Sequence, residues 1–197
     1  MTNMRLRFAP SPTGFLHLGG LRTALFNYIY CKKFSGKFIL RIEDTDQTRK
    51  VEGAVKNLIE SLQICNIEFD EGPHIGGDFG PYFQSQRLDI YNKYYKRLLK
   101  NNFAYVVFNT ENPDSNYDNR KFQEVEERLQ HEKFVIKLKM PRNQSITFFD
   151  EIRGEIKFES NLLKDPIIVK SDGYPTYHFA NVIDDYKMKI SHVIRGE

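Results

Sequence analysis

The sequence predicts an α/β fold in which a parallel sheet is interrupted by a small α+β insertion. Two observations lead to this fold class: a strand–loop–helix–strand pattern over residues 5–42, and charged helices alternating with short strands over residues 81–165. The chain has 197 residues, of which 40 % are hydrophobic and 28 % are charged. That composition is sufficient to bury a sizeable core in one or two domains.

The strand–helix–strand pattern is carried by three segments near the N-terminus. Residues 5–9 alternate between polar and apolar side chains, as a strand does, and Pro, Ser and Gly residues interrupt the pattern at 10–14. Residues 19–34 carry a helical apolar stripe, made of Leu21, Ala24, Leu25, Tyr28 and Cys31. Residues 37–42 are almost continuously apolar, which favours a buried parallel strand. We therefore expect a βαβ unit that binds ligands where its strands end.

The rest of the chain predicts further short elements. Helices are expected over 50–64, 85–101, 122–132 and 176–186, and strands over 103–108, 135–140, 146–149, 155–158, 167–170 and 189–194. Residues 70–83 and 109–119 are rich in turn-forming residues and are expected to be loops.

Composition excludes several classes of protein. The net charge of +3 permits contact with a polyanion but does not by itself argue for one. Cys31 and Cys65 lie in apolar, helix-like stretches, so two buried free thiols are a better interpretation than a disulfide, and no zinc site of four cysteines is expected. The apolar stretches are short, and neither a secretory signal nor an Arg- and Ser-rich leader is visible, so we expect a cytoplasmic protein with no membrane contact.

The first candidate site is the turn at residues 9–20, where the predicted helix begins. Gly19 and Gly20 open that helix, whose unpaired backbone N–H groups favour phosphate, and His17 can donate a hydrogen bond to a phosphate oxygen. Taken alone, the segment reads as an ordinary Pro/Gly turn with a surface histidine. Within a βαβ unit, phosphate binding is the stronger interpretation, although the segment is not a Walker loop.

The second candidate site is a group of three carboxylates within residues 43–46, at the end of the second strand. Such carboxylates repel one another unless a substrate ammonium or nearby arginines offset their charge. Asp46 or Thr45 is expected to cap the next helical segment. Glu43, which adjoins the buried strand, is the better candidate for a ligand-binding residue.

The third candidate site lies near the C-terminus of the sequence. Tyr177 and Asn181 are four residues apart and therefore share one helix face. Arg195 follows a predicted strand and can pair with a carboxylate through two nitrogens. Asp184 and Asp185 are expected to form a solvated helix end rather than a metal site.

These motifs together resemble the bacterial glutamyl-tRNA synthetases, a family of class I aminoacyl-tRNA synthetases. The segment that ends in His17-Leu18-Gly19-Gly20 resembles the HIGH-type signature, with Gly20 in place of its final histidine. Other segments follow the family in register, namely residues 41–46, 70–73, 82–87, 104–105, 116–120, 170–181 and 195–197. The resemblance extends over nearly the whole chain.

The resemblance implies an incomplete Rossmann-like (HUP-type) catalytic domain interrupted by an insertion that binds the acceptor end of tRNA. The expected limits are 1–80 for the first half of the catalytic domain, 81–165 for the acceptor-stem-binding insertion, and 166–197 for the start of the second half. Val107 and Asn109 occupy positions where some members have cysteine ligands, so no zinc is expected.

The resemblance also implies a set of site residues. Glutamate would be bound by Arg7, Ser11, Glu43, Tyr177, Asn181 and Arg195. ATP would be bound by His17, Gly19 and Gly20, with His17 also catalytic. ATP would be accompanied by Mg²⁺. The implied partners are tRNA(Glu), ATP and L-glutamate, and the implied activity is that of a glutamate–tRNA ligase.

The family's KMSKS-type lysine loop and anticodon-binding domain have no counterpart in these 197 residues. We therefore expect that the chain alone is inactive and that a complementary C-terminal chain is a candidate partner. Two alternatives are a glutamyl-Q tRNA(Asp) synthetase-like enzyme and a non-catalytic remnant that binds tRNA or a partner. The sequence leaves open the discrimination between tRNA(Glu) and tRNA(Gln) and the oligomeric state.

Overall fold

The computed structural model describes residues 4–112, 115, 117 and 120–196. Parts of the predicted loop at 109–119 and of the motifs at 116–120 and 195–197 lie outside the described residues. The chain divides into two compact units, Met1–Tyr91 with Tyr177–Glu197, and Asn92–Thr176. Among the described residues, no helix combines the length and apolarity needed to span a membrane.

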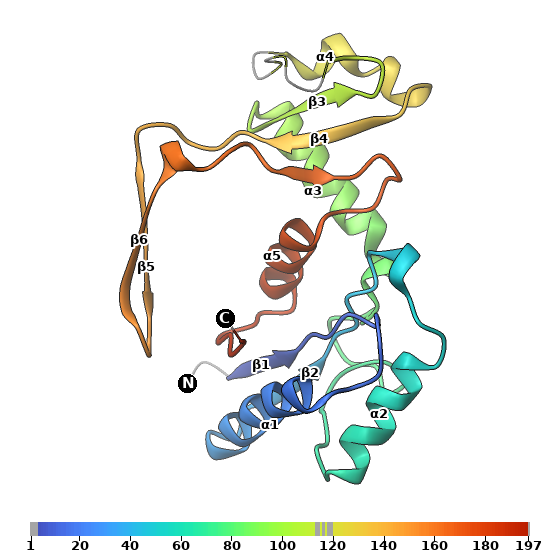
Figure 1. Cartoon of the computed structure of the whole chain (residues 1–197), viewed down its shortest axis with the longest axis vertical. Coiled ribbons are helices and arrows are strands. Elements are labelled where there is room, and N and C mark those ends of the chain that lie inside the picture. The colour runs from blue at the N-terminus through green and yellow to red at the C-terminus, as the bar shows by residue number, and fades with distance from the viewer. Residues whose placement is uncertain (1–3, 113–114, 116, 118–119, 197) are drawn as a thin grey trace. The chain divides into compact units, whose positions relative to one another are not determined.

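The first unit is built on a parallel pair of strands, which confirms the predicted fold class. Strand β1 (Arg5–Phe8) pairs in parallel with β2 (Lys37–Leu40), and α1 (Leu18–Lys33) connects them (Figure 1). On its other side, β2 and the residues after it bond to a loop: the Leu40 and Ile42 N–H groups donate to the carbonyls of Glu71 and Tyr82 at 2.9 and 2.8 Å. The carboxyl ends of β1 and β2 therefore lie together, as expected for a βαβ unit.

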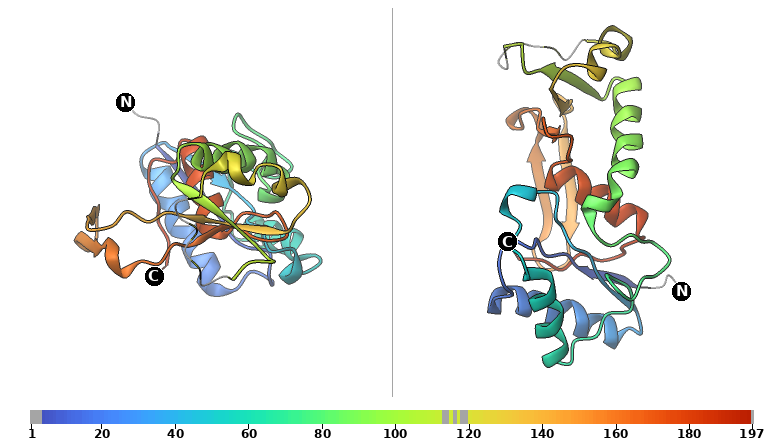
Figure 2. Two further views of the ribbon diagram at one scale, coloured as in Figure 1. Left: turned by 90° about the horizontal axis from the view of Figure 1, so that it is seen from above. Right: turned by 90° about the vertical axis from the view of Figure 1, so that its right-hand side faces the viewer.

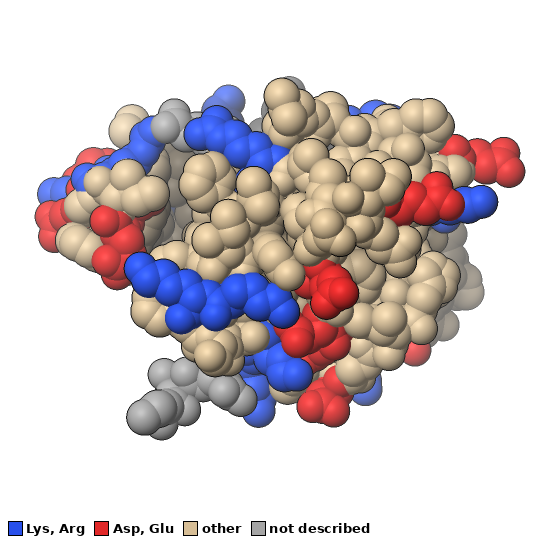
Figure 3. All heavy atoms as spheres, turned by 90° about the horizontal axis from the view of Figure 1, so that it is seen from below, with Lys and Arg blue, Asp and Glu red and all other residues tan. Residues whose placement is uncertain are grey.

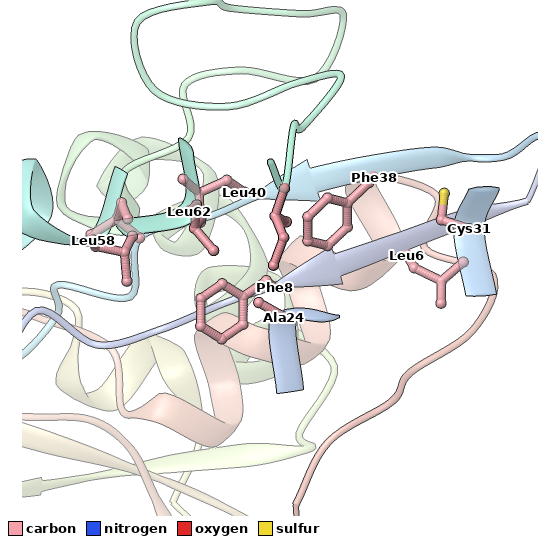
Figure 4. Close-up of a cluster of buried hydrophobic side chains, with 10 residues drawn as sticks. Leu6, Phe8, Ala24, Cys31, Phe38, Leu40, Leu58 and Leu62 are labelled. Carbon is pink, nitrogen blue, oxygen red and sulfur yellow. The ribbon is translucent and has the colours of Figure 1, made fainter. Parts of the chain in front are cut away.

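The core of this unit lies between the strands and two helices. The strand residues Leu6, Phe8, Phe38 and Leu40 pack with Ala24 and Cys31 of α1 and with Leu58 and Leu62 of α2 (Ala54–Ile64), as Figure 4 shows. Full burial of one such side chain contributes about 1.5–3 kcal/mol.

The apolar stripe predicted on α1 is partly wrong. Leu25 is 42 % exposed, and the buried position is taken instead by Asn27, whose Nδ2 donates to the carbonyl oxygens of Thr23 and Ile194, each at 2.9 Å. Phe26 and Ile29 of α1 are also exposed.

Figure 3 shows a broad uncharged surface flanked by basic and acidic side chains.

Two predicted helices begin later than their apolar patterns suggested. Residues Gln47–Arg49 form a separate 3₁₀ helix, and α2 starts only after Gly53, which has a φ of 77° that favours glycine. The segment Gln84–Arg87 is also a 3₁₀ helix, followed by α3 (Leu88–Lys100). Cys65, which comes just after α2, is exposed, so the prediction of two buried thiols holds only for Cys31.

The end of the first unit contains the predicted helix α5 (Tyr177–Lys187) but not the strand predicted at 189–194. Lys189 has a φ of 55°, which turns the backbone away from extended geometry. Beyond it, the contact with β1 is made by Ser191, whose N–H donates to Arg5 O at 2.9 Å and whose Oγ accepts from Arg5 N–H at 2.8 Å. The His192 N–H also donates to Arg5 O, at 3.4 Å, and these bonds to one residue of β1 replace the expected strand ladder.

The second unit contains the predicted short strands. They form an antiparallel sheet of β3 (Ala104–Phe108), β4 (Phe134–Leu138) and β7 (Ile167–Val169), and a separate hairpin of β5 (Ser145–Asp150) and β6 (Gly154–Glu159). In Figures 1 and 2, β5 and β6 run side by side as a two-stranded ribbon. The domain limits expected from the family resemblance stay a prediction.

The single helix predicted at 122–132 is wrong. The structure has a short α4 (Phe122–Val125) and a 3₁₀ helix at Arg128–Gln130. The Arg128 guanidinium lies 3.8 Å from the centre of the Phe108 ring and pairs with Glu111 at 2.9 Å. We attribute the break to these contacts, which are made with residues outside the segment and which helical periodicity cannot reveal.

Candidate amino-acid and nucleotide site

The turn after β1 is fixed by backbone contacts with later segments. The Pro10 carbonyl accepts from Glu43 N–H, and the Pro12 carbonyl accepts from Val51 N–H, each at 2.9 Å. Both bonds tie the turn to the segment that follows β2. Ser11, between the two prolines, is exposed on this ordered turn.

His17 forms the N-cap of α1. Its Nδ1 accepts from Gly19 N–H at 3.1 Å, so in the neutral ring Nε2 carries the proton and can donate to a ligand. The side chain is exposed, and the first turn of α1 has no acidic residue. This helix start therefore offers donors and no competing carboxylate to an anion.

The structure gives Gly19 and Gly20 a local packing reason. A Cβ on Gly19 would lie 3.0 Å from Cε1 of His17, and a Cβ on Gly20 would lie 2.9 Å from Cδ1 of Leu16. Both distances are too short for ordinary contacts. The two glycines therefore let the His17 and Leu16 side chains lie against the start of α1.

A cavity of about 290 Å³ lies at the end of β1 in the first unit. Its lining residues are Arg7, Phe8, Ala9, Thr23, Tyr177, Ile194, Arg195 and Gly196. Three of the six predicted glutamate-binding residues, Arg7, Tyr177 and Arg195, are thus brought together from both ends of the sequence. Thr23 and Ile194 were not predicted to line it, because neither has a charged side chain that would indicate a binding site.

The two arginines of this cavity differ in their surroundings. Arg7 is 5 % exposed and is held by Asp185, whose Oδ1 and Oδ2 accept from its Nε and Nη2, each at 3.2 Å. Arg195 is exposed, and among the described residues its one recorded bond is a donation from Nε to Gly196 O at 3.4 Å. Arg7 is therefore a fixed cation, and Arg195 is one that remains open to a ligand.

Glu43 and Asn181 are not among the residues that line the cavity, but both contact the buried Arg41. Its Nη2 donates to Glu43 Oε1 at 2.9 Å and to Asn181 Oδ1 at 3.3 Å. Its Nη1 donates to Asp185 Oδ1 at 2.7 Å. Arg41 thus joins the predicted anion, Glu43, to the carboxylate that holds Arg7.

The buried charges shift one another's titration. Burial raises the pKa of Glu43, and the charges of Arg41 and Arg7 oppose that rise only in part. For Arg41, burial alone would lower the pKa, but the carboxylates of Glu43, Asp185 and Asp184 outweigh it, so the pKa rises. Arg41 therefore stays charged, while Glu43 is easier to protonate than an ordinary glutamate.

The prediction that Asp184 belongs to a solvated helix end is wrong. Its side chain is fully buried, and it accepts hydrogen bonds from Gln84 Nε2 at 2.9 Å, Arg87 Nε at 2.8 Å and Tyr91 Oη at 2.7 Å. Asp185 is partly buried. The segment 82–87 could have pointed to this burial, because its Gln84 and Arg87 are themselves buried and both donate to Asp184.

In the acidic segment after β2, the predicted capping role of Asp46 is confirmed. Asp46 caps the 3₁₀ helix by accepting from Thr48 N–H at 3.2 Å, and hydrogen bonds from Thr48 and Arg49 lower its pKa to about 2. Within the described part of the chain, no group of three or more His, Cys, Asp or Glu residues is arranged to hold a metal ion. The absence of zinc remains a prediction.

A larger cavity, of about 570 Å³, lies beside α2 and contains none of the predicted site residues. Its lining combines apolar residues with ionisable residues of both signs, namely Lys50, Val51, Glu52, Gly53, Val55, Lys56, Ile59, Glu60, His74 and Phe83. The smaller cavity, with two arginines in its wall, has the chemistry of a binding site for a charged ligand.

The first unit thus combines a βαβ unit, a capped helix start and a cavity with two arginines at the end of β1. Residues 3–197 match the family model described as tRNA synthetases class I (E and Q), catalytic domain, and the chain belongs to this family.

The similar proteins point to the glutamate branch of that family. The chain is 48 % identical to the glutamate–tRNA ligase of Chlorobium phaeobacteroides over 98 % of its length, and 45 % identical to that of Clostridioides difficile over 99 %. It is also similar to the crystal structure of a glutamate tRNA ligase from Elizabethkingia meningosepticum in complex with its amino acid, with a TM-score of 0.89 and 44 % identity, covering 99 % of this chain and 44 % of that one. The chain spans 43 % and 45 % of the length of the two curated relatives.

Proposed function

We propose that this chain binds L-glutamate and ATP as the catalytic part of a glutamate–tRNA ligase. The observation that carries the proposal is the cavity at the end of β1, whose wall holds Arg7 and Arg195, with the Glu43 carboxylate linked to it through Arg41. An acidic amino acid carries two carboxylates and one ammonium, so its site needs fixed cations and one anion. The names of the relatives support the same substrate.

The proposed glutamate contacts are divided between the substrate's carboxylates and its ammonium. Arg195 and Arg7 bind the two substrate carboxylates, and the Glu43 carboxylate binds the ammonium. Glu43 Oε1 accepts from Arg41, whereas no hydrogen bond to Oε2 is recorded among the described residues, so Oε2 is the atom that we propose meets the substrate. Tyr177, which lines the cavity, Asn181, which contacts Arg41, and Ser11 on the turn after β1 complete the proposed set.

ATP is proposed to bind at the start of α1, where His17 Nε2–H and the helix N-terminus can meet phosphate oxygens. His17 is also the proposed catalytic residue, because a donor on the phosphates stabilises the charge that develops there. Gly19 and Gly20 expose the backbone of the same turn. Mg²⁺ would arrive with ATP and offset phosphate charge, and we assign no residue of this chain to it.

The proposed reaction has two steps. The α-carboxylate of glutamate attacks the α-phosphorus of ATP and displaces pyrophosphate, which leaves glutamyl-AMP. A terminal ribose hydroxyl of tRNA(Glu) then attacks the activated carbonyl carbon and displaces AMP. In both steps the proposed contribution of the chain is positioning and charge stabilisation. Residues 81–165 are proposed to bind the acceptor stem, and the cytoplasmic location and a complementary C-terminal chain stay predictions.

Isothermal titration of the 197-residue chain with L-glutamate and L-glutamine tests the proposed substrate. Glutamine has the same size but lacks the second carboxylate, so it should bind at least about tenfold more weakly, the equivalent of one charge-assisted hydrogen bond. Equal binding of both amino acids, or no binding of glutamate at millimolar concentration, would contradict the proposed site.

A further inference from the structure

Four charged side chains form an unbroken series of ion pairs behind the cavity. In order they are Glu43, Arg41, Asp185 and Arg7, and we call them the charge chain. The pairs are 2.9 Å for Arg41–Glu43, 2.7 Å for Arg41–Asp185 and 3.2 Å for Arg7–Asp185. Negative and positive groups alternate, so every member has an opposite charge beside it. The two end members of the charge chain, Glu43 and Arg7, are proposed to bind glutamate, and the two middle members have no assigned role.

Arg41, a middle member of the charge chain, cannot reach a ligand directly. The Arg41 side chain has no exposed surface, and its two terminal nitrogens already donate to Glu43, Asn181 and Asp185. Its Nε lies 4.0 Å from Asp184 Oδ2. Arg41 is thus surrounded by protein acceptors, and any effect it has on a ligand must act through them.

Asp185 determines how Arg7 presents its guanidinium. The two recorded bonds use Nε and Nη2 of Arg7, and Nη1 has no hydrogen-bond partner among the described residues. Because the guanidinium is planar and two of its nitrogens are held, the direction of Nη1 is fixed as well. Asp185 is itself anchored from the other side by Arg41.

We propose that Asp185 is a positioning residue for glutamate binding, because it holds Arg7 by two nitrogens and leaves Nη1 for a substrate carboxylate. Arg41 extends the same constraint to Glu43, whose Oε2 is left for the substrate ammonium. The substrate then completes the charge chain, since its carboxylate meets the terminal cation and its ammonium meets the terminal anion. This inference rests on the proposed function and adds two residues that act behind the site.

A purely structural role for these ion pairs is the alternative. Buried pairs stabilise a fold only modestly, and removing one partner is costly because it leaves an uncompensated charge. The chain offers a matched control: Glu71 is buried and accepts from Arg5 Nη1 at 2.7 Å and Nη2 at 2.9 Å, but it contacts no member of the charge chain. Glu71→Gln should therefore perturb stability without changing how Arg7 is held.

The decisive experiment compares Asp185→Asn, Asp185→Glu and Glu71→Gln by titration with L-glutamate and by urea unfolding. We expect Asp185→Asn to weaken glutamate binding by about tenfold or more, since a charge-assisted pair is lost. Asp185→Glu should recover most of that affinity because it restores the charge. Glu71→Gln should lower the unfolding midpoint and leave affinity within about twofold.

The outcomes separate this inference from the proposed function. Wild-type affinity in Asp185→Asn, or an equal loss of affinity in Glu71→Gln, would overturn the positioning role while leaving the glutamate site intact. Failure of the wild-type chain to bind glutamate would overturn the proposed function, and the positioning role with it.

A second measurement, by NMR, follows the Arg7 side chain in the wild-type protein and uses one variant only to assign its signals. In ¹⁵N NMR spectra of the arginine side chains, assigned with Arg7→Lys, glutamate should shift the Arg7 Nη1 signal and leave its Nε–H protected from exchange. Loss of that protection on binding would mean that glutamate displaces Asp185, which contradicts the inference. The test remains valid if Asp185→Asn does not fold.

Discussion

His17 and the charge chain differ in their exposure and in how far apart their residues lie in the sequence. His17 is exposed, carries no ion pair among the described residues, and lies in one continuous run with Gly19 and Gly20. The charge chain is largely buried and joins residues that are up to 178 positions apart in the sequence. The exposed turn can bind an anion with local backbone geometry, whereas the buried chain depends on tertiary structure to bring compensating charges together. The two regions should therefore respond differently to substitution.

The largest effect is expected where buried charge loses its partner. Asp184→Ala should lower the free energy of unfolding by about 3–5 kcal/mol, because Arg87 would be left buried without its carboxylate. Urea unfolding followed by circular dichroism measures this change. Glu60→Ala, which removes an exposed ion pair with Lys56, is the control and should change it by less than about 0.5 kcal/mol. Similar values for the two variants would mean that the buried network contributes little.

Arg195→Ala should separate binding from stability. Arg195 is exposed and makes no ion pair within the described residues, so its removal should leave the unfolding midpoint unchanged. Glutamate affinity should fall by about tenfold or more, because a substrate carboxylate loses its open cation. Titration calorimetry provides the comparison, with Lys56→Ala as a control for lost surface charge. Unchanged affinity would remove Arg195 from the site.

Acidification should weaken glutamate binding, and the weakening should begin above pH 4.5, the ordinary pKa of a glutamate side chain. The ionised Glu43 binds the substrate ammonium, so affinity is complete above the pKa of Glu43 and is lost as the pH falls through it. Burial raises that pKa despite Arg41 and Arg7, and Asp185 adds to the rise, so the loss begins above pH 4.5. At lower pH the affinity should fall about tenfold per pH unit, as expected for one proton.

Titrations between neutral pH and pH 4.5 measure this dependence. The side-chain carboxylate of free glutamate has a pKa of about 4.3 and so contributes only at the lower end of the range. Glu43→Gln should bind weakly and show a flatter profile. Constant wild-type affinity down to pH 4.5 would show that Glu43 does not bind the ammonium.

The smallest effect is expected at the exposed turn. His17→Ala should weaken ATP binding by about fivefold, which corresponds to one neutral hydrogen bond. It should also lower the free energy of unfolding by about 1 kcal/mol, since α1 loses its cap. His17→Asn keeps a capping acceptor, so it should restore stability and still bind ATP weakly. Restored ATP affinity in His17→Asn would show that only the cap matters.

The same contrast explains what the sequence could predict. Contiguous patterns were sufficient for the βαβ unit, the short strands of the second unit and the capping role of Asp46, because the interactions involved are local. The burial of Asp184 and the pairing of Asp185 with Arg7 could not be predicted, since a pair of adjacent aspartates at a helix end is usually solvated. Local signals also failed at 189–194, where Ser191 and His192 both bond to Arg5 of β1 and form no strand.

A crystal structure of this chain grown with L-glutamate near neutral pH tests the proposed site most directly. We predict glutamate in the cavity at the end of β1, with its carboxylates on the Arg195 guanidinium and on Arg7 Nη1, and its ammonium on Glu43 Oε2. The bonds between Arg7 and Asp185 should remain in place. Glutamate bound elsewhere, or bound in this cavity with neither carboxylate on an arginine, would contradict the proposed site.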